Sequence, residues 1–132
     1  RTGMTTLLLD THAWVWSLTA PELLSAPARR AIGSVDAVMV SPISFFEIGQ
    51  KVRLGKWPEM EPHAAKLPDL LAEQGGVVAP FTPAIALHAS LRTWAHRDPF
   101  DRILASTAEL SALTLVTRDP IFVEVPELRR LW

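Results

Sequence analysis

The sequence predicts an α/β domain in which helices cover a mostly parallel β-sheet. Short apolar runs alternate with helical segments along the chain, and several helices begin at a capping residue followed by proline. Strands that alternate with helices form parallel sheets, because each crossover returns the chain to the same edge of the sheet. At 132 residues the chain is long enough for one hydrophobic core and too short for two. We therefore expect a single domain over residues 1–132, with every functional group on that scaffold.

Four short apolar runs are the predicted strands. They cover residues 5–10, 37–41, 76–81 and 113–119. None alternates cleanly between apolar and polar residues, which is typical of strands buried on both faces of a parallel sheet. We therefore expect all four strands to lie inside the layered structure.

Three of the predicted helices share one start signal. Ser-Pro at 41–42, Thr-Pro at 82–83 and Asp-Pro at 98–99 each place a capping side chain before a proline in the first turn. These helices are expected to run through residues 54, 95 and 110, the first of them ending at Gly55. Further helices are predicted from near Thr11 and over residues 25–32 and 67–74, whereas residues 55–63 are the least regular segment.

The composition excludes several classes of protein. Without cysteine, the chain has no disulfide, no thiolate metal site and no cysteine nucleophile. No apolar run reaches the ~20 residues that a membrane span needs, and no basic-then-apolar secretory signal opens the chain. We therefore expect a cytoplasmic location and no membrane partner. Residues 1–3, which precede Met4, resemble the remnant of a cloning or purification tag.

The net charge of −1 provides no overall attraction to nucleic acids. Small basic groups occur at residues 29–30, 51–56 and 92–102. Charged residues usually lie at solvated surfaces, so we interpret these groups as exposed helix faces.

Four acidic residues are expected at one edge of the sheet. Asp10 ends the first apolar run, Asp119 follows the fourth, Glu47 lies early in the helix after the second, and Asp101 lies in the first turn of its helix. In parallel sheets the ligand crevice lies beyond the carboxyl ends of the strands. Carboxylates that converge there repel one another unless a cation offsets their charge. With oxygen ligands and no cysteine, the matched cations are Mg²⁺ and Mn²⁺.

Each acid also has a purely structural interpretation. Asp98 and Asp101 fit the N-cap and third position of one helix, where carboxylates accept from free N–H groups, and we interpret Asp98 mainly as a cap. Asp10 as the N-cap of the helix near Thr11 stays an open alternative, and Asp119 before proline is also typical of a turn. Glu47 follows Ser44 at capping-box spacing, but the Ser-Pro start at 41–42 makes that box spurious.

The four histidines show no metal-ligand pair at i, i+4 spacing and no nucleophile motif, so we interpret them mainly as surface or packing residues. The pair next to the Asp98 turn, His96 with Arg97, is the first candidate for substrate contact. Arg102 is a further candidate.

Four segments together resemble a known family. These are LLLDTHAWVW, VSPISFFEIGQKVRLGK, HRDPFDRILASTAEL and LTLVTRDPIF. They resemble the PIN-domain ribonucleases, and within them the VapC toxins of bacterial type II toxin–antitoxin pairs. The resemblance covers Thr5 to Trp132, and the order and spacing of the four acidic blocks make it specific.

The resemblance implies both a fold and a site. The fold is a three-layer sandwich around a five-stranded sheet, with residues 129–132 as the fifth strand. The acidic quartet of the family falls on Asp10, Glu47, Asp101 and Asp119, which are expected to be catalytic and to bind Mg²⁺. Thr117 matches the recurrent threonine before the last acid, and Asp98 matches a capping or supporting position.

The implied activity is Mg²⁺-dependent endoribonuclease cleavage by a metal-activated water, which leaves a 5′-phosphate and a 3′-hydroxyl. Exposed loops of structured RNA, including tRNA, are the expected substrates. Two alternatives stay open: a non-catalytic PIN-like binding module, and an aspartate-based phosphatase, whose D-x-D-x-T motif would here carry His12 in place of its second acid.

The resemblance also implies partner chains. A cognate antitoxin is expected, with a homodimer and a toxin–antitoxin hetero-oligomer as the assemblies. Five aromatic residues are expected to be exposed in part and to need cover by another chain, because they exceed what one small core readily hides. They are Trp14, Trp16, Phe45, Phe46 and Trp57.

Overall fold

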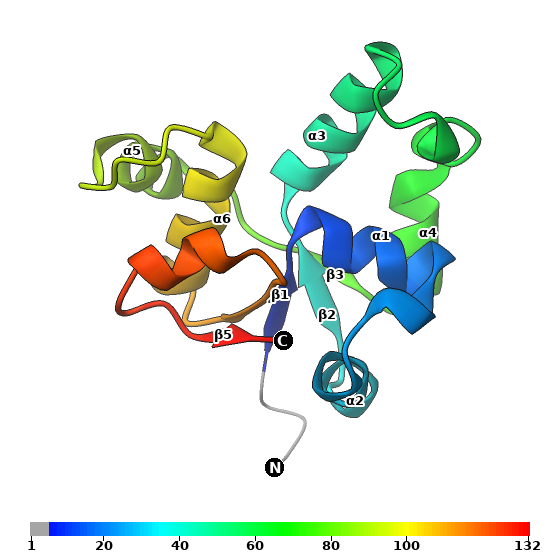
Figure 1. Ribbon diagram of the computed structural model, residues 1–132, viewed down its shortest axis with the longest axis horizontal. Coiled ribbons are helices and arrows are strands. Elements are labelled where there is room, and N and C mark those ends of the chain that lie inside the picture. The colour runs from blue at the N-terminus through cyan, green and yellow to red at the C-terminus, as the bar shows by residue number, and fades with distance from the viewer. Residues whose placement is uncertain (1–5) are drawn as a thin grey trace.

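The computed structural model describes residues 6–132, so the expected tag remnant at residues 1–3 lies outside the described part of the chain. Figure 1 shows the elements in their order along the chain. The strands are β1 (Leu7–Leu9), β2 (Val38–Val40), β3 (Val77–Val78), β4 (Thr114–Val116) and β5 (Arg130–Leu131). The helices are α1 (Thr11–Thr19), α2 (Ala26–Ser34), α3 (Pro42–Arg53), α4 (Leu67–Glu73), α5 (Pro83–Leu91) and α6 (Pro99–Leu110). Short 3-10 helices are η2 (Pro21–Leu23), η3 (Pro58–Met60), η4 (Ala64–Lys66) and η5 (Pro120–Glu124).

The five strands form one sheet in the order β3-β2-β1-β4-β5, and every neighbouring pair is parallel. From β1 the chain first builds outward through β2 and β3, then crosses to the other side to add β4 and β5. The predicted α/β class and the five-stranded sheet are therefore confirmed. Loops leaving β1 and β4 diverge at this reversal of strand order, which is where open α/β sheets bind ligands.

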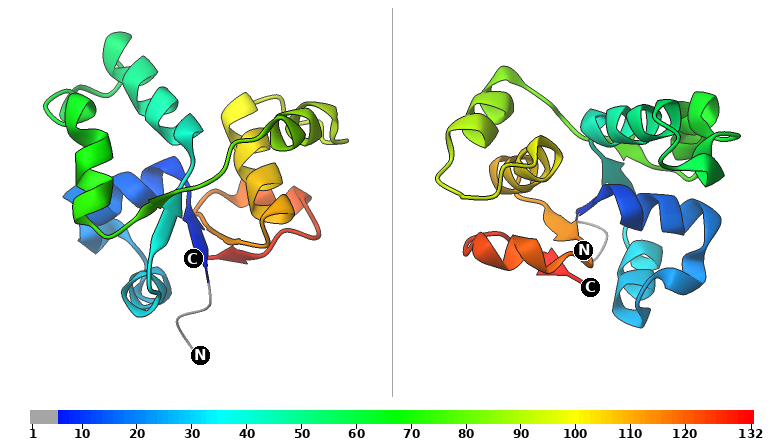
Figure 2. Two further views of the ribbon diagram at one scale, coloured as in Figure 1. Left: turned by 180° about the vertical axis from the view of Figure 1, so that it is seen from behind. Right: turned by 45° about the horizontal axis from the view of Figure 1, so that its top comes forward.

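Helices cover both faces of the sheet, and the two cores follow from the pleat of β1. Leu7 and Leu9 point to the core formed with α1, α2, α3 and α4, whereas Leu8 points to the core formed with α6 and η5. Figures 1 and 2 show α5 and α6 on one side of the sheet and α1, α2 and α4 on the other. Successive side chains of a strand point to opposite faces, so an apolar run of three leucines serves both cores.

The expectation that all strands are buried is wrong for β3. Val77 and Val78 are 48% and 53% exposed. This strand lies at the edge of the sheet and pairs only with β2. An edge strand lacks a second neighbouring strand. A continuous apolar run, without alternating polar residues, therefore does not mean that the strand is buried at this position.

One helical prediction is wrong. Helix α5 ends at Leu91 rather than near residue 95, because the backbone turns to an extended conformation at Arg92. The segment 55–63 consists of turns around the short η3, yet it buries Met60 in the core at 1% exposure. Among the described residues, no helix is long and apolar enough to cross a membrane.

The expected exposure of the aromatic residues holds only for Phe46, which is 59% exposed. Trp14 is fully buried, its ring lies 4.9 Å from that of Phe45, and its indole N–H donates to Gln74 Oε1 at 3.1 Å. Trp16, Phe45 and Trp57 are half-buried at the edge of the core. The core on the α1 side of the sheet therefore hides more aromatic surface than composition suggested.

Candidate active site

The four predicted acids lie at the carboxyl end of the sheet. β1 and β4 are neighbours there, and the Asp10 N–H donates to the Val116 carbonyl at 3.0 Å, which holds the two strand ends together. Asp10 leaves β1, Asp119 follows β4 by a short loop, Glu47 projects from α3 and Asp101 from α6. Sequence positions more than a hundred residues apart thus meet at one sheet edge.

One pocket of about 460 Å³ collects these side chains. All four acids of the predicted quartet border it, together with Asp98. The remaining lining residues are Thr11, His12, Trp16, Lys51, Leu104, Arg118 and Pro120. The pocket is therefore acidic at its base and carries two basic side chains.

Asp10 combines a capping role with an unfavourable charge. Its Oδ1 accepts from the Ala13 N–H at 2.8 Å as the N-cap of α1, and its carboxylate also contacts the Thr117 hydroxyl. Burial raises the pKa of Asp10 above its usual value, and Glu47 raises it further, although the bonds from Thr117 and Ala13 oppose this. The capping and site interpretations of Asp10 are thus compatible.

Glu47 is held by two side chains. Its Oε1 accepts from the Thr11 hydroxyl at 2.7 Å, and its Oε2 forms an ion pair with Lys51 Nζ at 2.8 Å. The Ser44 hydroxyl lies 2.8 Å from that of Thr11, to which it donates because the Thr11 proton is used on Glu47. Ser44 makes no capping box with Glu47, because Ser41 is the N-cap of α3. Glu47 therefore has a fixed orientation beside the pocket.

Asp101 has a partner that sequence spacing did not predict. Its Oδ2 lies 2.7 Å from His96 Nε2. Burial raises the pKa of Asp101 to about 6, and the nearby carboxylates of Asp98 and Asp119 raise it too, whereas the bond to His96 lowers it. The desolvated acid is thus stabilised from one side by an imidazole.

Asp98 and Asp119 both act as caps. Asp98 Oδ1 accepts from the N–H groups of Phe100 and Asp101 at the start of α6. Asp119 Oδ1 accepts from the Ile121 N–H at the start of η5, and its own N–H donates to the Thr117 hydroxyl. Thr117 therefore links the ends of β1 and β4 through Asp10 and Asp119.

Among the described residues, the close set of possible metal-ligand atoms includes only one member of the predicted quartet, Asp101. One set of three such atoms, from His96, Asp98 and Asp101, lies within 4.8 Å of one another, while no three members of the quartet meet this distance. Asp98 in this set is already engaged in capping, and His96 is bonded to Asp101. The quartet therefore shares a pocket without forming a tight ligand cluster.

The three side chains expected to contact substrate do not border the acidic pocket. Arg97 is exposed and lines a separate pocket with residues of α5 and α6. His96 bonds to Asp101 but is not among the residues that line the acidic pocket. Arg102 donates its N–H groups to five backbone carbonyls, so the structure places it in the support of the 89–96 segment. The loop that carries His96 and Arg97 folds back against α6, where its carbonyls accept from Arg102.

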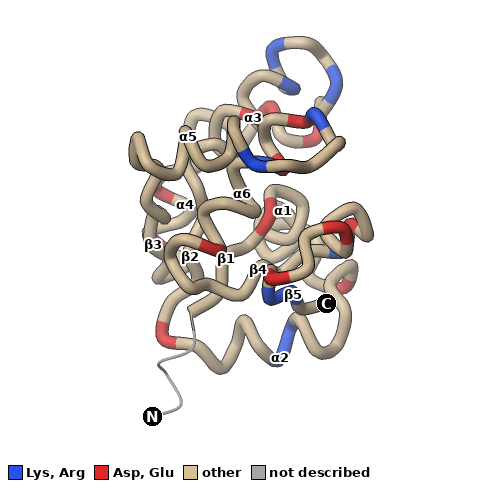
Figure 3. The backbone as a smooth tube through the Cα atoms, turned by 90° about the vertical axis from the view of Figure 1, so that its left-hand side faces the viewer, with Lys and Arg blue, Asp and Glu red and all other residues tan. Residues whose placement is uncertain are grey.

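The pocket instead presents His12, Trp16, Lys51 and Arg118, which the sequence analysis did not select. His12 stacks on Trp57 with 4.9 Å between ring centroids, and Arg118 lies over the Trp16 ring. Available signals were the positions of Arg118 directly before Asp119 and of Lys51 one turn after Glu47. Figure 3 shows Lys and Arg near the end of α3 and near α2 and β5, so the basic residues form no single belt.

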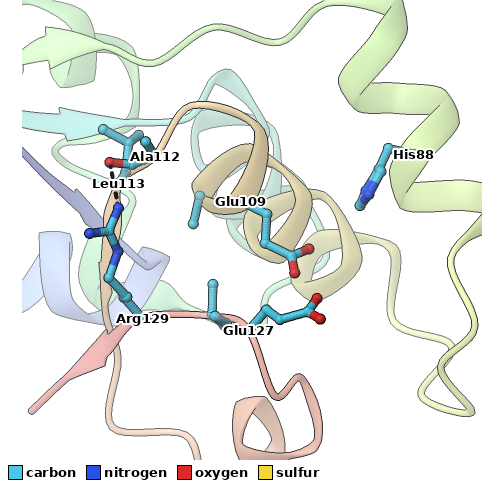
Figure 4. Close-up of a pocket in the computed structure, with 8 residues that line it drawn as sticks. His88, Glu109, Ala112, Leu113, Glu127 and Arg129 are labelled. Atoms are coloured by element: carbon cyan, nitrogen blue, oxygen red, sulfur yellow. Dashed lines mark hydrogen bonds between the residues drawn. The ribbon is translucent and has the colours of Figure 1, made fainter.

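A second pocket, at the other end of α6, has a different character. Figure 4 shows the carboxylates of Glu109 and Glu127 directed toward the same space, with His88 on the facing helix. Glu109 Oε1 lies 2.6 Å from Arg92 Nη1, an ion pair whose angle departs from that of a hydrogen bond. Glu109 is therefore already paired with a cation of the chain, and among the described residues no cluster of metal-ligand atoms lies in this pocket.

An all-parallel α/β sandwich with an acidic pocket at its strand reversal is the class that the fold and geometry define. The PIN domain profile matches residues 7–128. The chain is 36% identical over 123 residues to Ribonuclease VapC22 of Mycobacterium tuberculosis, and the match covers 88% of each chain. The chain therefore belongs to the PIN-domain family, and the resemblance to VapC toxins is confirmed.

Solved structures show the same fold. A DNA-bound VapBC of Salmonella typhimurium matches with a TM-score of 0.69 and 19% identity, over 97% of this chain and 98% of that one. A VapBC2 of Rickettsia felis bound to a promoter DNA fragment matches with a TM-score of 0.64 and 15% identity, over 96% and 98%. A toxin–antitoxin complex from Klebsiella pneumoniae matches with a TM-score of 0.64 and 19% identity, over 92% and 94%.

Proposed function

We propose that this chain is a divalent-metal-dependent endoribonuclease that acts as the toxin of a toxin–antitoxin pair. The observation that carries the proposal is the acidic pocket, in which Asp10, Glu47, Asp101 and Asp119 border one space at the carboxyl end of a PIN-domain sheet. Similarity to a relative named as a ribonuclease supports RNA as the substrate.

The side chains of the pocket fit Mg²⁺ or Mn²⁺. All the acids offer oxygen, the ligand atom that these hard cations prefer. Burial raises the pKa of Asp10 and of Asp101, so ionised carboxylates are disfavoured there without a compensating cation. We propose that Asp10, Asp101 and Asp119 hold the ion and that Glu47 contacts it or accepts a proton.

Bound there, the ion would supply Lewis acidity that favours ionisation of water and offsets charge on the phosphate. The chain itself orients the acids. Thr117 and the Ala13 N–H hold Asp10, and Thr11 with Lys51 holds Glu47 in reach of the pocket. In the proposed reaction water oxygen bonds to phosphorus and the bond from phosphorus to the ribose 3′-oxygen breaks. The water proton passes to Glu47 or solvent, and the leaving 3′-oxygen gains one.

The rim of the pocket suits single-stranded RNA. Lys51 and Arg118 are the cations that border it, and they can approach phosphate oxygens. His12 and Trp16 offer aromatic surface of the kind on which unstacked bases pack. We therefore propose exposed RNA loops, with tRNA among the candidates, as substrates.

Cleavage of a defined stem-loop RNA tests the activity. We expect cleavage with Mg²⁺ or Mn²⁺, none with a chelator, and products that carry a 5′-phosphate and a 3′-hydroxyl. Asp10→Asn serves as the inactive control. Cleavage that persists in chelator would contradict the metal requirement, and RNA binding without cleavage under any condition would favour the non-catalytic alternative. Release of phosphate from a phosphomonoester would favour the phosphatase alternative.

Partner chains form the second part of the proposal. The three structural neighbours named above were solved as toxin–antitoxin complexes, which supports a cognate antitoxin for this chain. We propose that the pair acts in the cytoplasm. Leu87 and Leu91 on α5 are 61% and 78% exposed, and Phe46 on α3 is 59% exposed. We propose that these side chains contribute to homodimer or antitoxin contacts, since large apolar side chains exposed on a surface favour association. Light scattering that finds a strict monomer, both alone and with the neighbouring gene product, would contradict this.

A further inference from the structure

Arg102 uses its whole guanidinium group on backbone carbonyls. Its Nε donates to Ala89 O at 2.8 Å. Its Nη1 donates to Trp94 O at 2.8 Å and His96 O at 2.9 Å, and its Nη2 donates to Ser90 O and Arg92 O. A guanidinium has five N–H donors, so these bonds account for all of them.

The accepting carbonyls belong to one continuous stretch, the end of α5 and the loop that follows it. The last carbonyls of a helix have no partner inside the helix, and Ala89 and Ser90 supply two of them here. A positive group at this end also interacts favourably with the helix dipole. The remaining carbonyls, of Arg92, Trp94 and His96, come from a loop without regular structure. Arg102 thus replaces the backbone pairing that this segment lacks.

The same loop supplies the imidazole that contacts Asp101. The carbonyl of His96 accepts from Arg102, and its Nε2 lies 2.7 Å from Asp101 Oδ2. Two consecutive residues of α6 therefore hold the backbone and the side chain of one histidine. Asp101 Oδ1, by contrast, has no hydrogen-bond partner among residues 6–132. Fixing Oδ2 leaves Oδ1 as the oxygen available to the pocket.

We infer that Arg102 is a positioning residue for the acidic site, which it serves by holding the 89–96 loop so that His96 orients the Asp101 carboxylate. This inference rests on the proposed nuclease function for its kinetic consequence, but its geometry concerns only residues of this chain. Groups that orient the ligands of a metal site commonly change activity or metal affinity by about 10- to 100-fold when removed.

A double-mutant cycle separates positioning from simple stabilisation. The variants are Arg102→Lys, which keeps the charge but cannot span five carbonyls, His96→Ala, and the two combined. We expect each single variant to lower kcat about 10-fold or more with KM within about threefold, and the double variant to be no slower than His96→Ala. Arg129→Lys is the matched control, because Arg129 also donates to a carbonyl, that of Ala112, far from the acidic pocket. Additive losses in the double variant would overturn the inference.

A second readout needs no RNA. In ¹⁵N-resolved spectra at constant pH, the His96 Nε2 resonance of folded Arg102→Lys should move toward that of an imidazole free in solution, while the control leaves it unchanged. An unmoved His96 resonance would overturn the inference. If Arg102→Lys does not fold, the wild-type chain decides: slowly rotating, individually resolved Arg102 Nη protons are expected, and fast averaging would refute the inference.

The two readouts also separate this inference from the proposed function. A wild-type chain that cleaves no RNA would refute the nuclease proposal, whereas the spectra would still show whether Arg102 holds His96 against Asp101.

Discussion

The acidic side chains at the two ends of α6 lie in opposite electrostatic environments. At the N-terminal end, Asp98 and Asp101 face a pocket with three further carboxylates, and burial raises the pKa of Asp101 to about 6. At the C-terminal end, Glu109 Oε1 lies 2.6 Å from Arg92 Nη1. The side chains of Glu109 and Arg92 are only 15% and 12% exposed. The same helix thus carries Glu109, whose charge is neutralised by Arg92, and Asp101, which lacks a full counter-charge.

The difference indicates which acids are present for stability. An acid paired with arginine contributes to folding, and breaking the pair leaves a buried charge. Acids gathered without enough cations oppose folding in the absence of a ligand, so their presence points to function. Only the N-terminal end of α6 meets the second description.

The largest effect should come from removing an acid at the N-terminal end. Asp101→Asn is expected to lower RNA cleavage roughly 100-fold or more, because a few kcal/mol of transition-state stabilisation correspond to that factor. Glu109→Gln, at the other end of α6, should keep cleavage within about threefold once folded. Initial rates at saturating RNA measure both, and equal losses would remove the contrast between the two ends.

Stability should change in the opposite direction. In chelator, Glu109→Gln is expected to lower the free energy of unfolding by about 1–3 kcal/mol, since Arg92 loses its partner. Asp10→Asn should melt at or above the wild-type temperature, because asparagine also caps helices and removes a desolvated charge. Thermal melts of the three proteins test this. A clear drop for Asp10→Asn would mean that capping is the main role of Asp10.

The pH dependence of stability sharpens the contrast further. The folded pKa of Asp101 is raised from 3.8 to about 6, so the folded state binds this proton more tightly than the unfolded state. Its contribution to stability is complete below the unfolded pKa and is lost as pH rises through about 6. The wild type in chelator should therefore lose at most about 3 kcal/mol relative to Asp101→Asn between about pH 4 and pH 7. Denaturant unfolding measures the difference, and a pH-independent gap would contradict the raised pKa.

The smallest effect is expected at Asp98. Serine can accept the same N–H bonds at the start of α6, so Asp98→Ser should retain activity within about threefold. Asp98→Ala, which cannot cap, should lose about 1 kcal/mol of stability. If Asp98→Ser were as inactive as Asp101→Asn, Asp98 would belong to the acids that bind the ion.

Local sequence determined the starts of the helices and the edge at which the acids gather. The caps Ser41, Thr82 and Asp98 act on N–H groups within three residues, so their partners can be recognised from the local sequence. Asp10 and Asp119 follow β1 and β4, and parallel strands bring their carboxyl ends together. These features were therefore predicted before any tertiary contact was known.

Tertiary structure alone decided the partners of the acids and the depth of each side chain. His96 meets Asp101, and Arg102 meets five carbonyls, because the loop after α5 folds back on α6. Trp14 is buried and Val78 exposed because one faces the core between α1 and the sheet and the other lies on an edge strand. The spacing of apolar residues along the sequence shows only which of them lie on the same face of a helix or strand. Whether a neighbouring layer covers that face depends on packing between segments far apart in the chain.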